Sequence, residues 1–396
     1  MPLTGITVID LTVARAGPTA VRQLADWGAD VIRIEPLDTD SGSLSGTHGS
    51  YDYMNLHRNK RVIALDLTSR QGYEVLCRLV TTADVVVENF RSPTKHKLKV
   101  DYDTLSALNP RLVYGSISGY GQDGPDAAKG AVDQIIQGRS GLMSLTGTPE
   151  SGPLRAGIAL SDLAAGHQLA FGLMVALYER VQSGVGQWVQ VSLLQSMVSF
   201  LDFQAAKYTV DGVVAKPVGN HHPDHAPMGT YVAKDGYINV AASTPRLWQS
   251  WLTVVSDPRF DDPRFATPLE RRRNREALNE IVADILATET VAHWVAALDE
   301  VGVPCGPVLA IDQVFNDPQV QHLNVTATVT HPERGTTAVL RTPVVMSRTT
   351  PAPPAAAPTK AQHTRQILTD LGFDAASIDA MITSRVIGVA NDDPTN

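Results

Sequence analysis

The stretch of chain around Asp162 places a carboxylate where it could act as a nucleophile. An apolar approach ends at Ser161-Asp162, and a nearly all-apolar helix is predicted to follow as far as about residue 181. Asp162 would therefore lie in the first turn of a buried helix. In one interpretation the carboxylate only complements the helix dipole, a contribution of under about 1 kcal/mol. In the other, helix N–H groups keep it ionised in a dry site, where it can attack an electrophile.

Basic side chains in the first 100 residues offer a second kind of chemistry, the binding of an anion. This stretch holds 12 Lys and Arg against 11 Asp and Glu, whereas the whole chain carries a formal net charge of −8. A locally basic surface on an acidic protein suits a small polyanion better than a long nucleic acid. Two solvated loops are the alternative interpretation. The basic residues form two groups, Arg58, Lys60 and Arg61, and then Arg91, Lys95, Lys97 and Lys99.

Two further motifs carry weaker signals. Residues 119–124 match GxGxxG, but a turn follows where a dinucleotide site needs the start of a helix, so we expect a shaped loop. His221, His222 and His225 could be metal ligands, but they lie in a loop flanked by Gly and Pro, and metal ligands usually come from rigid elements. We predict no metal here and expect a loop that contacts substrate or is merely exposed.

Length and composition narrow the class of protein. A chain of 396 residues with 43% hydrophobic residues is long enough for two or three domains, each with its own core. Cys77 and Cys305 share no CxxC spacing, so we expect no disulfide framework. No signal-peptide pattern opens the chain, and the most apolar run, residues 169–178, is about half the ~20 residues of a membrane span. We expect a cytoplasmic enzyme with no membrane or nucleic-acid partner.

The elements that must position these residues alternate between strand and helix over the first 200 residues. Short apolar strands separated by helices predict βαβ units and a mostly parallel sheet covered on both faces, an α/β fold. Ligands of such sheets bind beyond the carboxyl ends of the strands. We expect strands at residues 6–11, 31–34, 61–67, 84–87 and 112–117, and helices at 16–27 and 69–81.

From about residue 229 the pattern changes to that of a smaller α+β domain. Lys234-Asp235-Gly236 between two apolar runs is a hairpin signal, and the Pro-rich residues 351–358 predict an extended connector. We expect strands at 230–232 and 237–241, helices at 273–287 and 290–300, a rigid loop at 302–307, a hairpin within 326–346 and a last helix at 362–371.

Several blocks of residues follow one another along nearly the whole chain. They are Asp10-Leu-Thr with Ala16-Gly-Pro18, residues 24–35, Asn59-Lys-Arg61 before Ala64-Leu-Asp66, residues 83–90, 109–114 and 140–147, Asp162, residues 302–307 and Gln362-His-Thr. In these blocks and their order, the chain resembles the family III CoA-transferases. That group contains formyl-CoA transferase, carnitine CoA-transferase and the related α-methylacyl-CoA racemases.

The resemblance implies a large Rossmann-like domain and a smaller α+β domain, in two chains that interlock as a homodimer. It assigns residues 1–200 to the first part of the large, CoA-binding domain and 201–224 to a linker. Residues 225–320 would be the small domain, and 321–396 a linker and a return to the large domain with C-terminal helices.

The resemblance also implies that Asp162 is the nucleophile. Its carboxylate would attack an acyl-CoA thioester to give a mixed anhydride, and the released CoA would convert this to an aspartyl-CoA thioester, into which the acceptor acid enters. The acyl group stays activated throughout. No permanently bound cofactor is implied; the coenzyme A thioester is a substrate.

Residues that contact CoA follow from the same resemblance. A basic side chain at position 15, where formyl-CoA transferases have glutamine, would suit an acid with a second carboxylate. A loop that contacts the substrate acid would contain Gly219, Asn220 and His221. The expected CoA contacts are Arg15, Ala16, Arg33, Asn59, Lys60, Arg61, Asn89, Phe90, Arg91, Lys97 and Asp133.

Positions at which the chain departs from the family pattern limit the activities that we expect. The His and Glu that racemases use as acid and base fall on Val132 and Val232, which cannot transfer protons, so racemisation is disfavoured. The polyglycine loop of formyl-CoA enzymes is absent and Pro36 replaces a basic residue, so formate and oxalate are not favoured. We expect transfer of CoA from a donor such as succinyl-CoA to a small organic acid. A racemase or isomerase and a non-catalytic acyl-CoA-binding protein are the alternatives.

Overall fold

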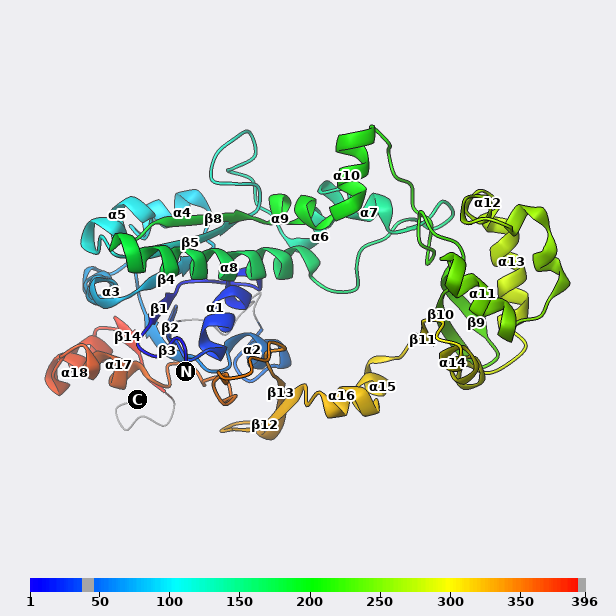
Figure 1. Ribbon diagram of the computed structural model, residues 1–396. Coiled ribbons are helices and arrows are strands. Elements are labelled where there is room, and N and C mark those ends of the chain that lie inside the picture. Colours follow the sequence, from blue (N-terminus) through cyan, green and yellow to red (C-terminus); the bar gives the residue numbers. More distant parts are fainter. Residues whose placement is uncertain (38–45, 391–396) are drawn as a thin grey trace. The chain divides into compact units, whose positions relative to one another are not determined.

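The computed structural model describes residues 1–37 and 46–390, and its largest element is a seven-stranded sheet (Figure 1). The strand order is β14-β3-β2-β1-β4-β5-β8, and every neighbouring pair is parallel except β14 with β3. The strands are β1 (Thr7–Asp10), β2 (Asp30–Glu35), β3 (Arg61–Leu65), β4 (Val85–Glu88), β5 (Val113–Ser118), β8 (Trp188–Ser192) and β14 (Ile387–Gly388). This confirms the expected α/β class with a predominantly parallel sheet.

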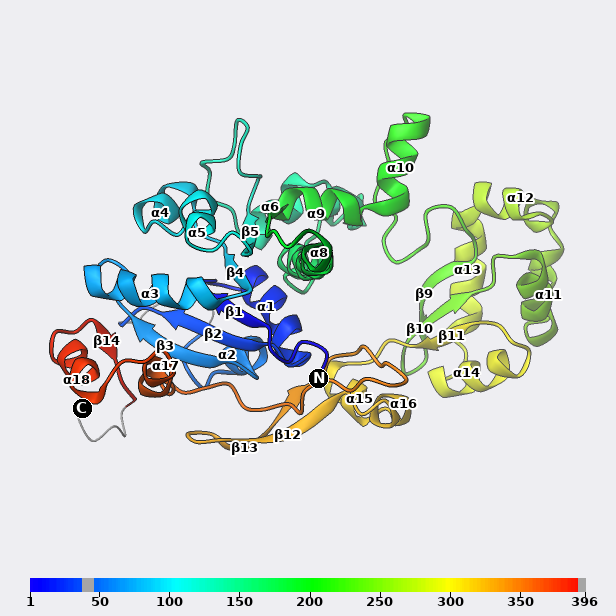
Figure 2. The same cartoon turned by 60° about the vertical axis from the view of Figure 1, so that its left-hand side comes forward.

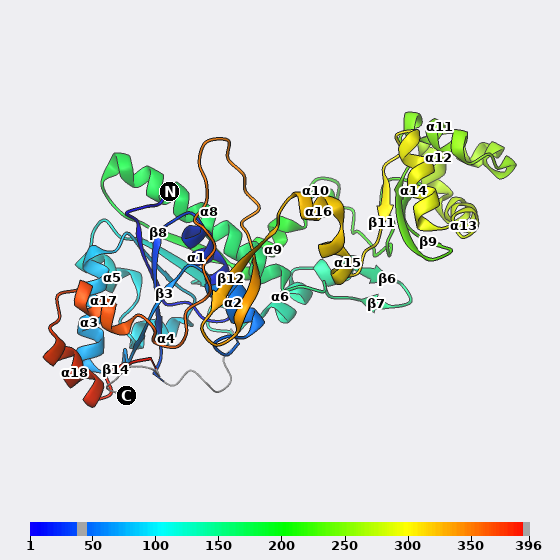
Figure 3. The same ribbon diagram turned by 90° about the horizontal axis from the view of Figure 1, so that it is seen from below.

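Helices cover both faces of this sheet, because successive strand residues point to opposite sides. Val8, Val85 and Val87 join one apolar core, and Ile9 and Val86 join another. The first core is closed by α1 (Ala16–Asp26), α6 (Asp133–Arg139), α8 (Leu160–Ser183) and α9 (Leu193–Phe200). The second is closed by α3 (Arg70–Thr82), α5 (Tyr102–Leu108), α17 (Thr364–Asp370) and α18 (Ala375–Thr383), so the end of the chain returns to the large sheet beside α3 (Figure 3).

Helix α8 is the longest helix and packs along α1 (Figures 1 and 2). It ends at Gly184, whose φ of +75° is left-handed and suits glycine. Among the described residues α8 is the single helix long and apolar enough to cross a bilayer; α13 and α14, given below, pass that test only as a pair bent by 110°. Half of the apolar window of α8 is buried inside the protein, as in a core helix.

The chain divides into two compact units. The larger contains Met1–Leu142, Arg155–Val213 and the chain from Asn324 on, and the smaller contains Met143–Leu154 and Val214–Leu323. Residues 143–154, which we expected in the large domain, cluster with the smaller unit, which begins again at residue 214 rather than 225. Other elements of the larger unit are α2 (Tyr51–His57), α4 (Ser92–Lys97), α10 (Asp202–Asp211), β12 (Thr326–His331) and β13 (Gly335–Leu340).

The smaller unit has its own core around a three-stranded antiparallel sheet in the order β11-β10-β9. The buried indoles of Trp248 and Trp251 pack against Phe260. Its main elements are β9 (Met228–Ala233), β10 (Gly236–Ala241), α11 (Pro245–Val254), α12 (Pro268–Arg273), α13 (Arg275–Leu286), α14 (Val291–Glu300) and β11 (Cys305–Pro307). Shorter elements are α7 (Leu142–Leu145), which begins at the last residue of the larger unit, β6 (Gly147–Thr148), β7 (Gly152–Pro153), α15 (Ile311–Asn316) and α16 (Pro318–His322), with 3-10 turns at Pro258–Asp261 and Pro263–Phe265.

One local expectation was wrong in part. Residues 302–307 are not entirely a loop, because Cys305–Pro307 pairs with β10 and completes the small sheet. The helix expected at residues 273–287 is present as α13, and a break at Asn274 separates it from α12. Pairing with β10 makes residues 305–307 a strand.

Candidate active site

Asp162 lies in the first turn of α8, as expected, and its carboxyl group is partly buried. Burial and the neighbouring Asp133 raise its pKa to about 6, and the Arg15 guanidinium opposes them. The shift runs opposite to the one that helix N–H groups alone would produce. Asp162 is a poorly solvated carboxylate that is still mainly ionised at pH 7, as a nucleophile must be.

Asp133, at the start of α6, anchors the residue before Asp162. Its Oδ1 accepts hydrogen bonds from the Ser161 amide at 2.9 Å and from Ser161 Oγ at 2.8 Å. Its Oδ2 accepts one from Gln137 Nε2 at 2.8 Å. Asp133 was an expected CoA contact, but the structure buries it (8% exposed), with Oδ1 bonded to Ser161 beside Asp162 and Oδ2 facing Gln137 and Arg155.

The loop between β1 and α1 provides the other side of this site. Arg15 precedes α1, and its Nη2 donates to both carboxylate oxygens of Asp52 on α2, at 2.7 and 2.8 Å. The carbonyl oxygen of Ala16 lies so close to α8 that a Cβ on Gly166 would be 2.7 Å from it. Gly166 is one helical turn after Asp162, so this loop packs against the helix that carries the carboxylate.

The turn after β4 holds the expected contacts Asn89, Phe90 and Arg91. The carboxamide of Asn89 makes two hydrogen bonds of 2.8 Å with the backbone of Val13. Phe90 is half-buried, and its amide donates to Glu88 Oε2 at 2.8 Å. Arg91 and Lys97 are exposed. These residues follow the carboxyl end of a central strand, where ligands of parallel sheets bind.

The first basic group is engaged in ion pairs inside the protein. Lys60 Nζ is fully buried and donates to Asp10 Oδ2 at 2.8 Å, and burial lowers its pKa to about 8 against the pull of Asp10. Arg33 Nη1 donates to the Thr12 carbonyl at 2.8 Å. Similar pairs join Arg58 to Asp26 and Arg61 to Asp30 and Asp370.

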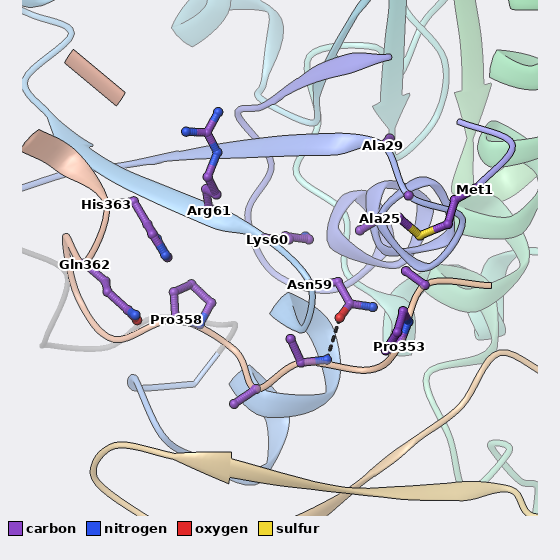
Figure 4. A pocket seen from close by; sticks show the side chains of 14 residues that line it. Met1, Ala25, Ala29, Asn59, Lys60, Arg61, Pro353, Pro358, Gln362 and His363 are labelled. Atoms are coloured by element: carbon purple, nitrogen blue, oxygen red, sulfur yellow. Dashed lines mark hydrogen bonds between the residues drawn. The ribbon is translucent and has the colours of Figure 1, made fainter. Parts of the chain in front are cut away.

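Asn59, Lys60 and Arg61 line a pocket of about 560 Å³ shown in Figure 4. Asn59 Oδ1 accepts a hydrogen bond from the Ala355 amide at 2.6 Å, and its Nδ2 donates to Asp26 Oδ1 at 3.0 Å. Residues 59–61 lead into the amino end of β3, whereas residues 89–91 follow the carboxyl end of β4. The two groups, which the family resemblance places against one nucleotide, are thus carried by different strands, and Lys60 extends to Asp10 at the end of β1, the strand beside β4.

The expected substrate loop belongs to the smaller unit. The Gly219 amide donates to the Gly147 carbonyl at 2.8 Å, and the ring of His221 packs 5.4 Å from that of Tyr231. Burial, followed by the charge of Arg275, lowers the pKa of His221. Asn220 accepts from the Thr230 amide through its carbonyl. In the described ranges, 1–37 and 46–390, no cluster of three His, Cys, Asp or Glu side chains could hold a metal.

Asp52 and Ser161 are site residues that the sequence did not reveal. Asp52 is 37 positions from Arg15, and only the return of α2 toward α1 pairs them. Ser161 had a local signal, because it directly precedes Asp162, but its partner Asp133 lies 28 positions away. Val132 and Val232 are both more than half exposed, and their aliphatic side chains offer no acid or base.

Comparison with known proteins shows the family to which the chain belongs. The sequence model described as CoA-transferase family III matches residues 3–364. The chain is 34% identical to a succinate–glutarate CoA-transferase of Agrobacterium fabrum, over 93% of this chain and 96% of that protein. It is 31% identical to the succinyl-CoA:glutarate CoA-transferase of Mus musculus, over 98% and 90% of the two chains. A crystal structure of a CAIB/BAIF family protein from Brucella suis superposes with a TM-score of 0.84 at 32% identity, covering 94% of this chain and 99% of that one. This chain therefore belongs to the family III CoA-transferases.

Proposed function

We propose that this enzyme moves CoA from succinyl-CoA or a similar donor to a small dicarboxylic acid, with Asp162 as the covalent nucleophile. The observation that carries the proposal is the state of Asp162. Its pKa of about 6 leaves it ionised at neutral pH, while partial burial removes the water that would blunt a carboxylate nucleophile.

The reaction would proceed in four displacements. The Asp162 carboxylate attacks the thioester carbonyl and expels CoA thiolate, leaving a mixed anhydride. The thiolate attacks the aspartyl carbonyl of the anhydride, which releases the donor acid and leaves an aspartyl-CoA thioester. The acceptor carboxylate then displaces thiolate from this thioester, forming a second anhydride. Attack of the thiolate on the acceptor carbonyl yields the new acyl-CoA and restores the Asp162 carboxylate.

Arg15 supports a dicarboxylic acid as substrate. It is close enough to Asp162 to lower the pKa of that carboxyl group, so its charge acts at the reacting centre. Its present partner is itself a carboxylate, that of Asp52, and both side chains are partly exposed, at 29% and 18%. The distal carboxylate of an acid bound at Asp162 would compete with Asp52 for the same guanidinium. Succinate and glutarate, named for the relatives, have such a second carboxylate.

For the nucleotide of CoA we propose the surface after the carboxyl end of β4, with Phe90, Arg91 and Lys97 as contacts. The exposed cations suit its phosphates, and the half-buried ring can pack against its base. The ion-paired Lys60 and Arg33 would instead stiffen the strands beneath this surface.

We also propose a cytoplasmic homodimer. Apolar side chains lie open along α8, with Phe171 73%, Tyr178 72% and Val181 82% exposed. A face this apolar is typical of a surface that another chain covers.

Isotope exchange tests the activity. Unlabelled succinyl-CoA, ¹⁴C-glutarate and the enzyme should give ¹⁴C-glutaryl-CoA, and Asp162→Asn should abolish that product while CoA binding persists. Full activity of Asp162→Asn would refute the assignment of the nucleophile. CoA binding by the wild type without exchange between any pair of acids would instead indicate a non-catalytic binding protein.

A further inference from the structure

The carboxamide of Asn89 ties together two neighbouring strand ends at the site. Strands β1 and β4 pair in parallel, and the last backbone bond between them runs from the Leu11 amide to the Val87 carbonyl, at 2.9 Å. Beyond that point, Asn89 Oδ1 accepts from the Val13 amide and Asn89 Nδ2 donates to the Val13 carbonyl, both at 2.8 Å. The Asn89 side chain thus makes with the backbone of Val13 the two hydrogen bonds that a backbone residue would make if strand β4 continued.

The loop held in this way has little freedom of its own. Thr12 is fixed from the other side, since its amide donates to Asp10 Oδ1 at 2.9 Å and its carbonyl accepts from Arg33 Nη1 at 2.8 Å. Ala14 has a φ of +57°, a left-handed conformation that costs a non-glycine residue about 1 kcal/mol or more and persists only where neighbouring bonds impose it. The two bonds from Asn89 to Val13 are such a constraint.

This loop also meets the nucleophile's helix. Directly after Ala14 come Arg15, whose charge acts on Asp162, and Ala16, whose carbonyl lies against α8 at Gly166. A shift of the loop would therefore move the guanidinium relative to the reacting carboxylate and open the packing one turn from it. Such misplacements are costly for catalysis even where no catalytic group is lost.

We propose that Asn89 is a positioning residue, whose clamp on Val13 sets Arg15 and Ala16 beside Asp162 and contributes little to the affinity for CoA. This inference rests on the proposed role of Asp162. It differs from the sequence-based expectation, in which Asn89 itself contacts the nucleotide.

Asn89→Asp tests the clamp with almost no change of shape. The introduced carboxylate keeps an acceptor for the Val13 amide but sets an oxygen against the Val13 carbonyl. Asn89→Ala removes both bonds and serves as a second variant if the first folds poorly. Asn109→Asp is the matched control: Asn109 Nδ2 also donates to backbone carbonyls, of Val80 at 3.0 Å and Ala83 at 2.8 Å, but ahead of the amino end of β5.

Two measurements distinguish a positioning role of Asn89 from a direct contact with CoA. The first is the dissociation constant of CoA, by calorimetry. The second is the rate at which succinyl-CoA acylates Asp162, by rapid quench and peptide mass spectrometry. We expect Asn89→Asp to slow acylation by about tenfold or more, with CoA affinity within about twofold of wild type. Asn109→Asp should change neither, although its melting temperature falls.

Lowering the pH supplies an independent readout. A protonated carboxyl group at position 89 can donate to the Val13 carbonyl as the amide did, so the ratio of variant to wild-type acylation rates should rise. Dividing by the wild-type rate at each pH removes the wild-type titration of Asp162 from the comparison.

Three results would overturn the inference. Weaker CoA binding with unchanged acylation at saturation would make Asn89 a ligand contact, and effects equal to those of Asn109→Asp would make it merely structural. An unchanged acylation rate in both Asn89 variants would show that the clamp is dispensable. Absence of any adduct on Asp162 in the wild-type enzyme would instead refute the proposed nucleophile, so the two failures are distinguishable.

Discussion

Burial and the charge of Asp133 raise the pKa of Asp162 by more than the charge of Arg15 lowers it. This raised pKa should be visible in the pH dependence of the transfer rate. The nucleophile must be ionised, and its pKa is raised to about 6. The transfer rate should therefore be level above this pH and fall about tenfold per unit below it. Asp133→Asn removes a negative neighbour, so the pKa of Asp162 should drop and the acid limb should move to lower pH.

A pH series of kcat/KM for both proteins checks this. Asp126→Asn is the control, since that carboxylate pairs with Lys129 and Arg139 and does not contribute to the pKa of Asp162. An acid limb that stays in place in Asp133→Asn would contradict the electrostatic account.

The pair between Arg15 and Asp52 gives a prediction about substrate selectivity. Charge-assisted hydrogen bonds contribute about 1.5–3 kcal/mol, so Arg15→Gln should raise KM for glutarate by about tenfold or more. KM for butyrate, which has no second carboxylate, should hardly change. Asp52→Asn frees the guanidinium and should lower KM for glutarate. Equal changes of KM for glutarate and butyrate would show that Arg15 does not bind the distal carboxylate.

At the scale of elements, the packing of α8 on α1 depends on Gly166. A Cβ there would lie 2.7 Å from the Ala16 carbonyl oxygen and 2.9 Å from the Thr19 side chain. Gly166→Ala should therefore lower the free energy of unfolding by about 1–3 kcal/mol, measured by chemical denaturation. Gly306→Ala, where no atom lies within 4 Å of the added Cβ, is the control. Equal stability of the two variants would refute the close approach.

The elements were predictable where they depend on local pattern. Apolar runs and breakers marked β1 to β5, α1, α3 and the start of α8, so the parallel sheet and the place of Asp162 followed from the sequence. The two-residue β14 and the short β11 carry too little pattern, and only their pairing partners make them strands.

The partners of the site residues were not predictable, because they too depend on tertiary contacts and not on local pattern. The sequence of a basic cluster such as Arg58, Lys60 and Arg61 is the same whether its charges face solvent or pair with buried carboxylates. The tertiary fold alone decides that Lys60 meets Asp10, 50 positions away. The clamp of Asn89 on Val13 spans 76 positions and has no sequence signal.

At the scale of the whole molecule, the exposed apolar face of α8 predicts a dimer. Sedimentation should give twice the chain mass of 42.5 kDa. Phe171→Lys places a charge on this face and should reduce the dimer fraction, whereas Leu269→Lys, on α12 and 54% exposed, should not. A wild-type enzyme that sediments as a monomer would contradict the prediction.

The central claim, that Asp162 carries the acyl group and then CoA, is tested most directly by following oxygen. In the proposed route the acceptor's attacking oxygen is left on Asp162 and leaves with the donor acid in the next turnover. After turnover of succinyl-CoA with ¹⁸O-glutarate, mass spectrometry should find ¹⁸O in the Asp162 side chain and then in released succinate. An Asp162 peptide without ¹⁸O after many turnovers, while glutaryl-CoA accumulates, would contradict the account.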